Sequence, residues 1–217
     1  MWMAIIAGIA AVALLIAFLT SRNRRAKTRH KSVSEVGLMF SIYVEPFGPD
    51  PKVLEGTGLP LFIEGLRGVA RNMIRFQPED GVEACFFDYI CETGAPGSEV
   101  AVERTVALFD YGKDMFSPFY LSADGTGVQP EIPGYGAADA GKFPGLPAGA
   151  KVYSDALDKL GALLNSGKTE LFQKEPDWNV QGAGQYLLLY GRSSLVAQGG
   201  YQDFVKAAKL LALRLTA

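Results

Sequence analysis

The residues that could carry out chemistry are few in this 217-residue chain. It has one histidine, His30, which lies in a basic run near the N-terminus. A Ser-His-Asp triad, a Cys-His pair or a multi-histidine metal site therefore cannot be assembled in the rest of the chain. We expect no catalytic residue, no metal ligand and no cofactor, and hence a protein that is not an enzyme.

Paired carboxylates are the acid–base arrangement that remains. Four acidic residues lie close together in sequence: Glu79, Asp80, Glu83 and Asp88. A pair of carboxylates can serve as general acid and base. Glu79-Asp80-Gly81 is, however, typical of a turn, and we favour that interpretation.

The glycine-rich segments do not form a nucleotide site. Gly182-Ala-Gly184 lacks the third glycine and the following helix of a dinucleotide fingerprint. Thr57-Gly58 and Thr126-Gly127 lack the lysine of a P-loop. These glycines are better explained by bends of the backbone.

The two cysteines, Cys85 and Cys91, are predicted to lie in one strand, six residues apart. At about 3.3 Å per residue their Cα atoms would be about 20 Å apart, which is beyond disulfide reach. The spacing matches neither CxxC nor a zinc pattern. We expect two free, half-buried thiols that fill space in the domain, as in a reducing compartment.

The elements that must position these groups begin with an uncharged N-terminus. Residues 1–20 carry no charged side chain, and the apolar stretch from Trp2 to Leu19 would rise about 27 Å as a helix, close to the hydrocarbon thickness of a bilayer. The sequence predicts a transmembrane helix at 1–20. We assign the anchor to Trp2, Ala4, Gly8, Ala11, Leu15 and Phe18. Small residues spaced by four, such as Ala13 and Ala17, would allow close packing of a partner helix.

A basic linker at residues 21–32 follows. It contains Arg22, Arg24, Arg25, Lys27, Arg29 and Lys31, and no acidic residue. A cleavable signal peptide has its basic residues before the apolar stretch, and here the order is reversed. Basic residues beside a span stay on the cytoplasmic side, so we expect a single-pass protein of the inner (cytoplasmic) membrane with its N-terminus outside. The run either sets this topology alone or also contacts anionic lipid headgroups.

The rest of the chain is acidic. Six of the 21 basic residues belong to the run, which leaves 15 basic against 23 acidic residues, a formal charge of −8. Nucleic-acid phosphates require a basic face, so we expect no nucleic-acid partner. Charge favours protein contacts instead.

Residues 33–217 are predicted to form one cytoplasmic α+β domain, a largely antiparallel sheet with packed helices. The clearest signal is a hairpin of strands at 82–93 and from Val100, where apolar residues alternate. Residues 122–150, with seven glycines and four prolines, predict a long surface excursion. Further predictions are two strands within 59–76, a strand at 119–121, a helix at 152–165, a hairpin at 178–190, a possible strand at 194–197, and an amphipathic C-terminal helix at 201–216.

The hairpin also carries a family resemblance. Gly81, Phe87-Asp88-Tyr89 and Thr93-Gly94, followed by Thr105-Val-Ala107, form the pattern G-x5-F-D-Y-x3-T-G and T-V-A. This pattern resembles a family of uncharacterised bacterial single-pass membrane proteins. The resemblance covers about Val69 to Ala217 and implies an N-terminal anchor and an α+β cytoplasmic domain, with no known reaction.

Two classes of function follow from these observations. We favour a non-catalytic, membrane-anchored accessory or scaffold subunit that stabilises or docks onto a larger membrane protein complex, with other integral membrane subunits as partners. A respiratory or photosynthetic complex would fit, although the span has no axial ligand for haem or pigment. The alternative is a membrane-tethered ligand-sensing or enzymatic domain whose pocket is walled by Phe87, Tyr89, Tyr186 and Tyr190.

Overall fold

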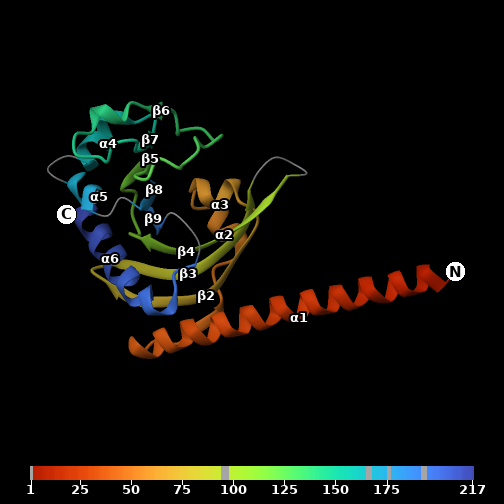
Figure 1. Ribbon diagram of the computed structural model, residues 1–217. Coiled ribbons are helices and arrows are strands. Elements are labelled where there is room, and N and C mark those ends of the chain that lie inside the picture. Colours follow the sequence, from red (N-terminus) through yellow and green to blue (C-terminus); the bar gives the residue numbers. More distant parts are fainter. Residues whose placement is uncertain (1, 94–97, 165–167, 175–176, 192–194) are drawn as a thin grey trace.

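A nine-stranded antiparallel sheet forms the body of the protein in the computed structural model, which describes residues 2–93, 98–164, 168–174, 177–191 and 195–217 (Figure 1). The strand order is β1-β2-β3-β4-β9-β8-β5-β7-β6. The strands are β1 (Val44–Phe47), β2 (Leu66–Glu79), β3 (Val82–Thr93), β4 (Val100–Asp110), β5 (Phe116–Ser122), β6 (Ala137–Ala138), β7 (Lys151–Tyr153), β8 (Trp178–Gly184) and β9 (Tyr186–Gly191).

The central hairpin of β3 and β4 confirms the strongest local prediction. The two strands pair antiparallel without a register break from Glu83↔Asp110 to Thr93↔Val100. Alternate residues of β3 face opposite sides of the sheet: Phe86 and Asp88 face one side, and Phe87 and Tyr89 face the other. The predicted hairpin near the C-terminus is also present, as β8 and β9.

Helix α1 (Trp2–Met39) corrects the prediction for the N-terminus (Figure 1). Residues 1–20 were expected to form a separate span and residues 21–32 a linker, whereas the chain from Trp2 through Met39 is one continuous helix whose last turns pack on the domain. Among the residues that the structure describes, no helix is both long enough and apolar enough to cross a membrane. The predicted transmembrane helix is therefore wrong, and so are the fold class that included it and the single-pass inner-membrane localisation.

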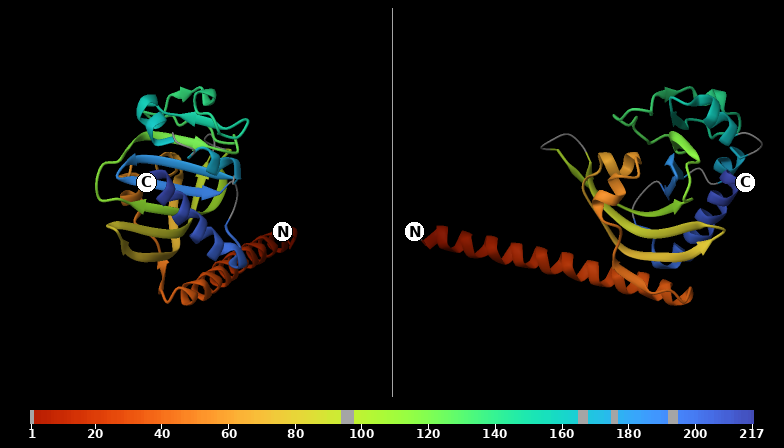
Figure 2. Two further views of the ribbon diagram at one scale, coloured as in Figure 1. Left: turned by 90° about the vertical axis from the view of Figure 1, so that its left-hand side faces the viewer. Right: turned by 180° about the vertical axis from the view of Figure 1, so that it is seen from behind.

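One face of the sheet is covered by α6 (Gln198–Thr216) and the C-terminal turns of α1 (Figures 1 and 2). Val33 and Val36 of α1 are buried there with Phe86 of β3. Helix α6 contributes a stripe at helical spacing, which matches the predicted amphipathic pattern: Tyr201, Phe204, Val205, Ala208, Leu211, Ala212 and Leu215. Two elements that are 160 residues apart in sequence thus share one core.

The other face carries two short helices, α2 (Pro51–Glu55) and α3 (Pro60–Glu64). Leu54, Leu59 and Phe62 from this region cover Phe87 and Tyr89. Two strands were predicted within 59–76, and the first of them is wrong because Pro60 begins a helix there. Proline is well suited to the first helical turn, where its missing N–H has no partner to lose.

The remaining segments surround the far end of the sheet. Of residues 122–150, Ser122 ends β5 and the rest contain only β6 and the short 3-10 helix η1 (Ala140–Lys142), yet Tyr135 and Phe143 from this excursion are buried. Helix α4 (Leu157–Leu164) is shorter than predicted because Lys151–Tyr153 join the sheet as β7. Helix α5 (Glu170–Lys174) follows. The possible strand at 194–197 is absent at 195–197, and residue 194 lies outside the described residues.

Candidate functional site

Asp88 anchors α1 to the sheet. As a residue Asp88 is 1% exposed, at the middle of β3, and its carboxylate accepts two hydrogen bonds from Arg29 of α1, Nε to Oδ2 at 2.8 Å and Nη2 to Oδ1 at 2.7 Å. Such a two-point pair between a guanidinium and a carboxylate is stronger and more directional than a single contact. Thr105 lies directly across on β4 and donates to Oδ1 at 3.0 Å.

A bulge in β2 brings the next partner. The register between β2 and β3 shifts between Arg71 and Ile74, and Asn72 within this bulge has a φ of 54°. Asparagine tolerates this left-handed conformation better than most residues. Its amide donates to Asp88 Oδ2 at 2.8 Å, and its Oδ1 lies 2.9 Å from Nδ1 of His30. The only histidine of the chain therefore links α1 to β2 through Asn72.

Arg29 also connects α1 to the start of α6. Its Nη1 donates to the carbonyl of Val196 at 2.6 Å, and its guanidinium lies over the Tyr201 ring at 5.6 Å. Burial alone would lower the pKa of Arg29, but the hydrogen bond and charge of Asp88 outweigh it, so that the pKa lies above its ordinary value. Arg29 therefore remains a cation and holds α1, β3, β4 and the entry to α6 together.

The other basic residues of the predicted cluster behave differently. Arg24, Arg25, Lys27 and Lys31 are exposed on α1, and the side chain of Arg22 lies outside the described residues. Arg24 and Arg25 make no ion pair with any residue that the structure describes. Of the predicted anchor residues Trp2, Ala4, Gly8, Ala11, Leu15 and Phe18, the structure places the backbone in α1, and their side chains lie outside its description.

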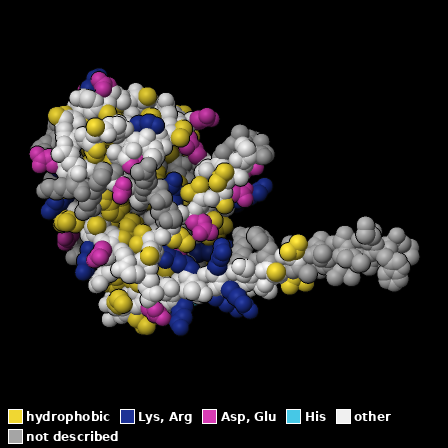
Figure 3. Space-filling view, viewed as in Figure 1, with side chains coloured by type: hydrophobic (Ala, Val, Ile, Leu, Met, Phe, Trp, Pro, Cys, Tyr) yellow, Lys and Arg dark blue, Asp and Glu magenta, His cyan; other side chains and the backbone are white. Residues whose placement is uncertain are grey.

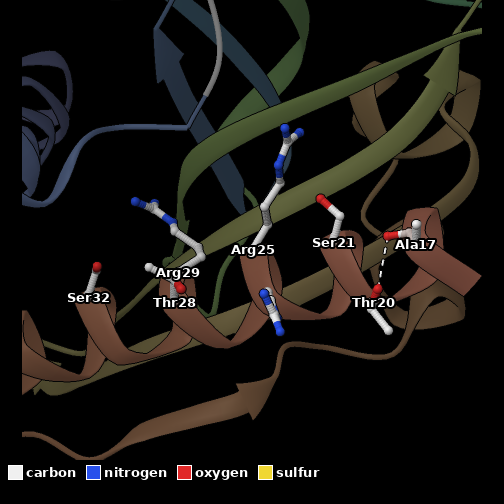
Figure 4. A pocket seen from close by; sticks show the side chains of 8 residues that line it. Ala17, Thr20, Ser21, Arg25, Thr28, Arg29 and Ser32 are labelled. Carbon is white, nitrogen blue, oxygen red and sulfur yellow. Dashed lines mark hydrogen bonds between the residues drawn. The ribbon is translucent and has the colours of Figure 1, made fainter.

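A groove of about 570 Å³ follows the face of α1 that carries Arg29. It is lined by Ala17, Thr20, Ser21, Arg24, Arg25, Thr28, Arg29 and Ser32. Arg25 and Arg29 point from the helix toward the strands, with Ser21 and Ser32 on the same side (Figure 4). In the space-filling view, Lys and Arg side chains gather in the hollow where α1 meets the domain (Figure 3).

The carboxylate pair, the less favoured interpretation of these four acidic residues, does not form among the described side chains. Asp80 and Gly81 make the turn between β2 and β3 with φ values of 53° and 79°, as the turn interpretation required. Glu83 pairs with Arg75 at the edge of the hairpin, and Asp88 lies five residues farther along β3. Within the described part of the chain, no group of three His, Cys, Asp or Glu side chains could hold a metal ion.

The two cysteines on β3 are free, as predicted, and both are buried, whereas half-buried positions were expected. Burial raises the pKa of the Cys85 thiol to about 12, and it also raises the pKa of Cys91. A thiol attacks as its thiolate, so both are poor nucleophiles at neutral pH.

The aromatic residues proposed as pocket walls pack mainly as core. Phe87, Tyr89 and Tyr190 are buried, with Tyr186 half-buried beside them. The ring of Phe62 packs on Phe87 and Tyr89 with centroid distances of 6.2 and 4.9 Å. Helix α3 thus fills the space that a ligand would need.

Comparisons with known proteins identify the fold. No family model matches the chain, and no curated protein matches it. The structure is similar to the crystal structure of the mycobacterial trehalose monomycolate transport factor A, TtfA, with a TM-score of 0.62 and 14% sequence identity. The similarity covers 88% of this chain and 95% of that chain, so the two chains share the fold over most of both.

Proposed function

We propose that this protein is a non-catalytic accessory factor that docks onto a larger membrane protein complex and presents α1 to it as a fixed arm. The observation that supports this proposal is the asymmetry of α1. Its C-terminal half is pinned to the domain by Arg29 and by the buried Val33 and Val36, whereas its N-terminal half extends beyond the domain (Figures 1 and 2).

The extended half offers apolar surface. Leu14 is 72% exposed and Ile16 is 56% exposed on it. The two side chains lie about 200° apart around the helix, so a partner that covers both must surround the arm and not only one face of it. Because the arm is held by a buried ion pair, a partner that binds it would gain a fixed orientation of the whole domain.

The fold is consistent with an accessory role. The similar protein TtfA is described as a transport factor. By this likeness, the partner of the present protein would be a transport complex, and the partner's contacting subunits would be integral membrane proteins. The domain's formal charge of −8 outside the basic run would then face basic surfaces of that complex.

The proposal is tested by purifying the full-length tagged protein in mild detergent. We expect a defined membrane complex to co-purify in stoichiometric amount. The double variant L14E/I16E should lose it, whereas the control L213E, at a residue of α6 that is 64% exposed, should retain it. Recovery of a lone monomer that a small metabolite stabilises against heat would overturn the proposal and favour the ligand-sensing alternative.

A further inference from the structure

The groove-lining face of α1 changes character along the helix. Its eight lining residues follow the spacing i, i+3, i+4, i+7 from Ala17 to Ser32, which places them on one face. Val33, the residue after Ser32, and Val36, one turn after Val33, are buried in the core. The lining residues before them, Ala17 excepted, carry a hydroxyl or a guanidinium on an aliphatic stem, and they leave the groove open. A face that is turned toward the domain but does not pack there is available for a ligand.

Uncompensated positive charge marks this face. Arg29 is satisfied by Asp88, and Glu103 is a second acidic group near it. Arg24 and Arg25 have no acidic partner among the described residues, as noted above. Two guanidinium charges therefore face the groove without a counter-charge in the described structure.

Hydroxyl donors accompany these cations. Thr20 already donates to the carbonyls of Ile16 and Ala17. The hydroxyls of Ser21, Thr28 and Ser32 make no hydrogen bond with any described residue, although all three line the groove. Ser21 lies one helical turn before Arg24 and Arg25, whereas Ser32 lies about 16 Å farther along the helix, so one small ligand can contact the two guanidinium groups and Ser21 but not all three hydroxyls.

We propose that this groove binds a phosphate group, held by Arg24 and Arg25 and by the hydroxyl of Ser21, which lies one helical turn before them. A phosphate has several strong acceptor oxygens in a tetrahedral arrangement, and guanidinium forks bind such groups at two points. The volume of about 570 Å³ admits the phosphate together with an attached alcohol or sugar. The same chemistry is presented by a phospholipid headgroup and by a soluble phosphate ester.

Two arms of one experiment separate these sources. In the first, inorganic phosphate and glycerol phosphate are titrated into the full-length protein, and the Nε–Hε NMR signals of its arginines are followed. In the second, flotation is measured with vesicles of phosphatidylcholine and phosphatidylglycerol, and with phosphatidylcholine vesicles as the uncharged reference.

The matched variants are R24Q/R25Q and K27Q/K31Q. Each removes two exposed charges from the same helix, but Lys27 and Lys31 do not line the groove. We expect R24Q/R25Q to weaken binding about tenfold or more, since two charge-assisted contacts are lost, and K27Q/K31Q to change it less than about threefold. Thermal unfolding should be unchanged in both.

Each outcome decides the proposal. Arginine shifts with the soluble ligands support it and identify a soluble phosphate as the source. Binding to the anionic vesicles alone, with the same dependence on R24Q/R25Q, supports it and identifies a headgroup. Equal losses in the two double variants would mean a diffuse charge effect and would overturn it, as would the absence of binding in both arms. Neither result depends on whether a protein complex co-purifies.

Discussion

Removing the charge of Asp88 should loosen α1 and destabilise the whole domain. The substitution D88N keeps the shape of the side chain and one carbonyl oxygen, which can still accept from Thr105 or Asn72. It removes the only carboxylate that the Arg29 guanidinium contacts in the described structure. The side chains are 16% and 2% exposed, so water cannot readily replace the lost partner.

The expected loss in the free energy of unfolding is about 3 kcal/mol. Breaking a buried ion pair from one side costs about 3–5 kcal/mol, because the remaining charge is left without a partner. We take the lower end because the asparagine preserves packing and part of the hydrogen bonding. The double variant R29M/D88N should regain much of this loss, since neither side chain then carries a buried charge.

Urea unfolding followed by circular dichroism measures these differences. The control is E92Q, which breaks the Arg67–Glu92 pair at 2.9 Å, whose side chains are 80% and 33% exposed. That change should cost less than about 1 kcal/mol. If D88N proved no more destabilising than E92Q, or if R29M/D88N proved additive, the buried pair would not hold α1 as described.

Two further results are expected. Cys85 and Cys91 should resist maleimide at pH 8 until the protein unfolds, and rapid labelling of the native protein would contradict their burial. The folded pKa of Cys85, about 12, lies above its unfolded value, so the unfolded state loses the thiol proton first. The free energy of unfolding should therefore fall as pH rises from about 9 to 12. Substituting Gly182 by alanine places a methyl group 2.2 Å from the ring of Phe119 and should lower the free energy of unfolding in urea by about 1–3 kcal/mol. The control G161A, with open space around the new methyl group, should be neutral or slightly stabilising, and equal effects of the two variants would refute the close approach.

The sheet was predictable where the pattern is local. The β3–β4 hairpin combines alternation of apolar residues with a short glycine-containing connection, and both signals depend only on neighbouring residues. The order of the nine strands was not predictable. It joins β4 to β9 and β8 to β5, and such pairings between distant segments depend on packing that a single sequence does not display.

The prediction for the N-terminus was wrong because it missed the continuity of α1 from Trp2 to Met39. The uncharged residues 1–20 and the basic residues 21–32 were interpreted as separate segments, although Ala, Leu, Arg and Lys are all good helix formers and nothing between them ends a helix. The apolar Val33 and Val36 that hold the end of α1 lie beyond both segments.

One signal for the Arg29–Asp88 pair was present in the sequence. Asp88 lies between Phe87 and Tyr89 in a strand whose neighbours on both faces are apolar, and a buried carboxylate there requires a cationic partner. The basic run offered six candidates, and only the helical phase of α1 selects Arg29 among them. The phosphate-binding role of Arg24 and Arg25 depends on the same phase.

That dependence makes α1 intolerant of small insertions. Each residue turns an α-helix by about 100°, so one extra alanine between Arg25 and Arg29 would leave the ion pair with Asp88 intact and rotate every preceding side chain away from the groove. Two inserted residues would turn those side chains to nearly the opposite face. The length of the chain between Arg25 and Arg29 therefore sets the direction in which the entire N-terminal arm presents its surface.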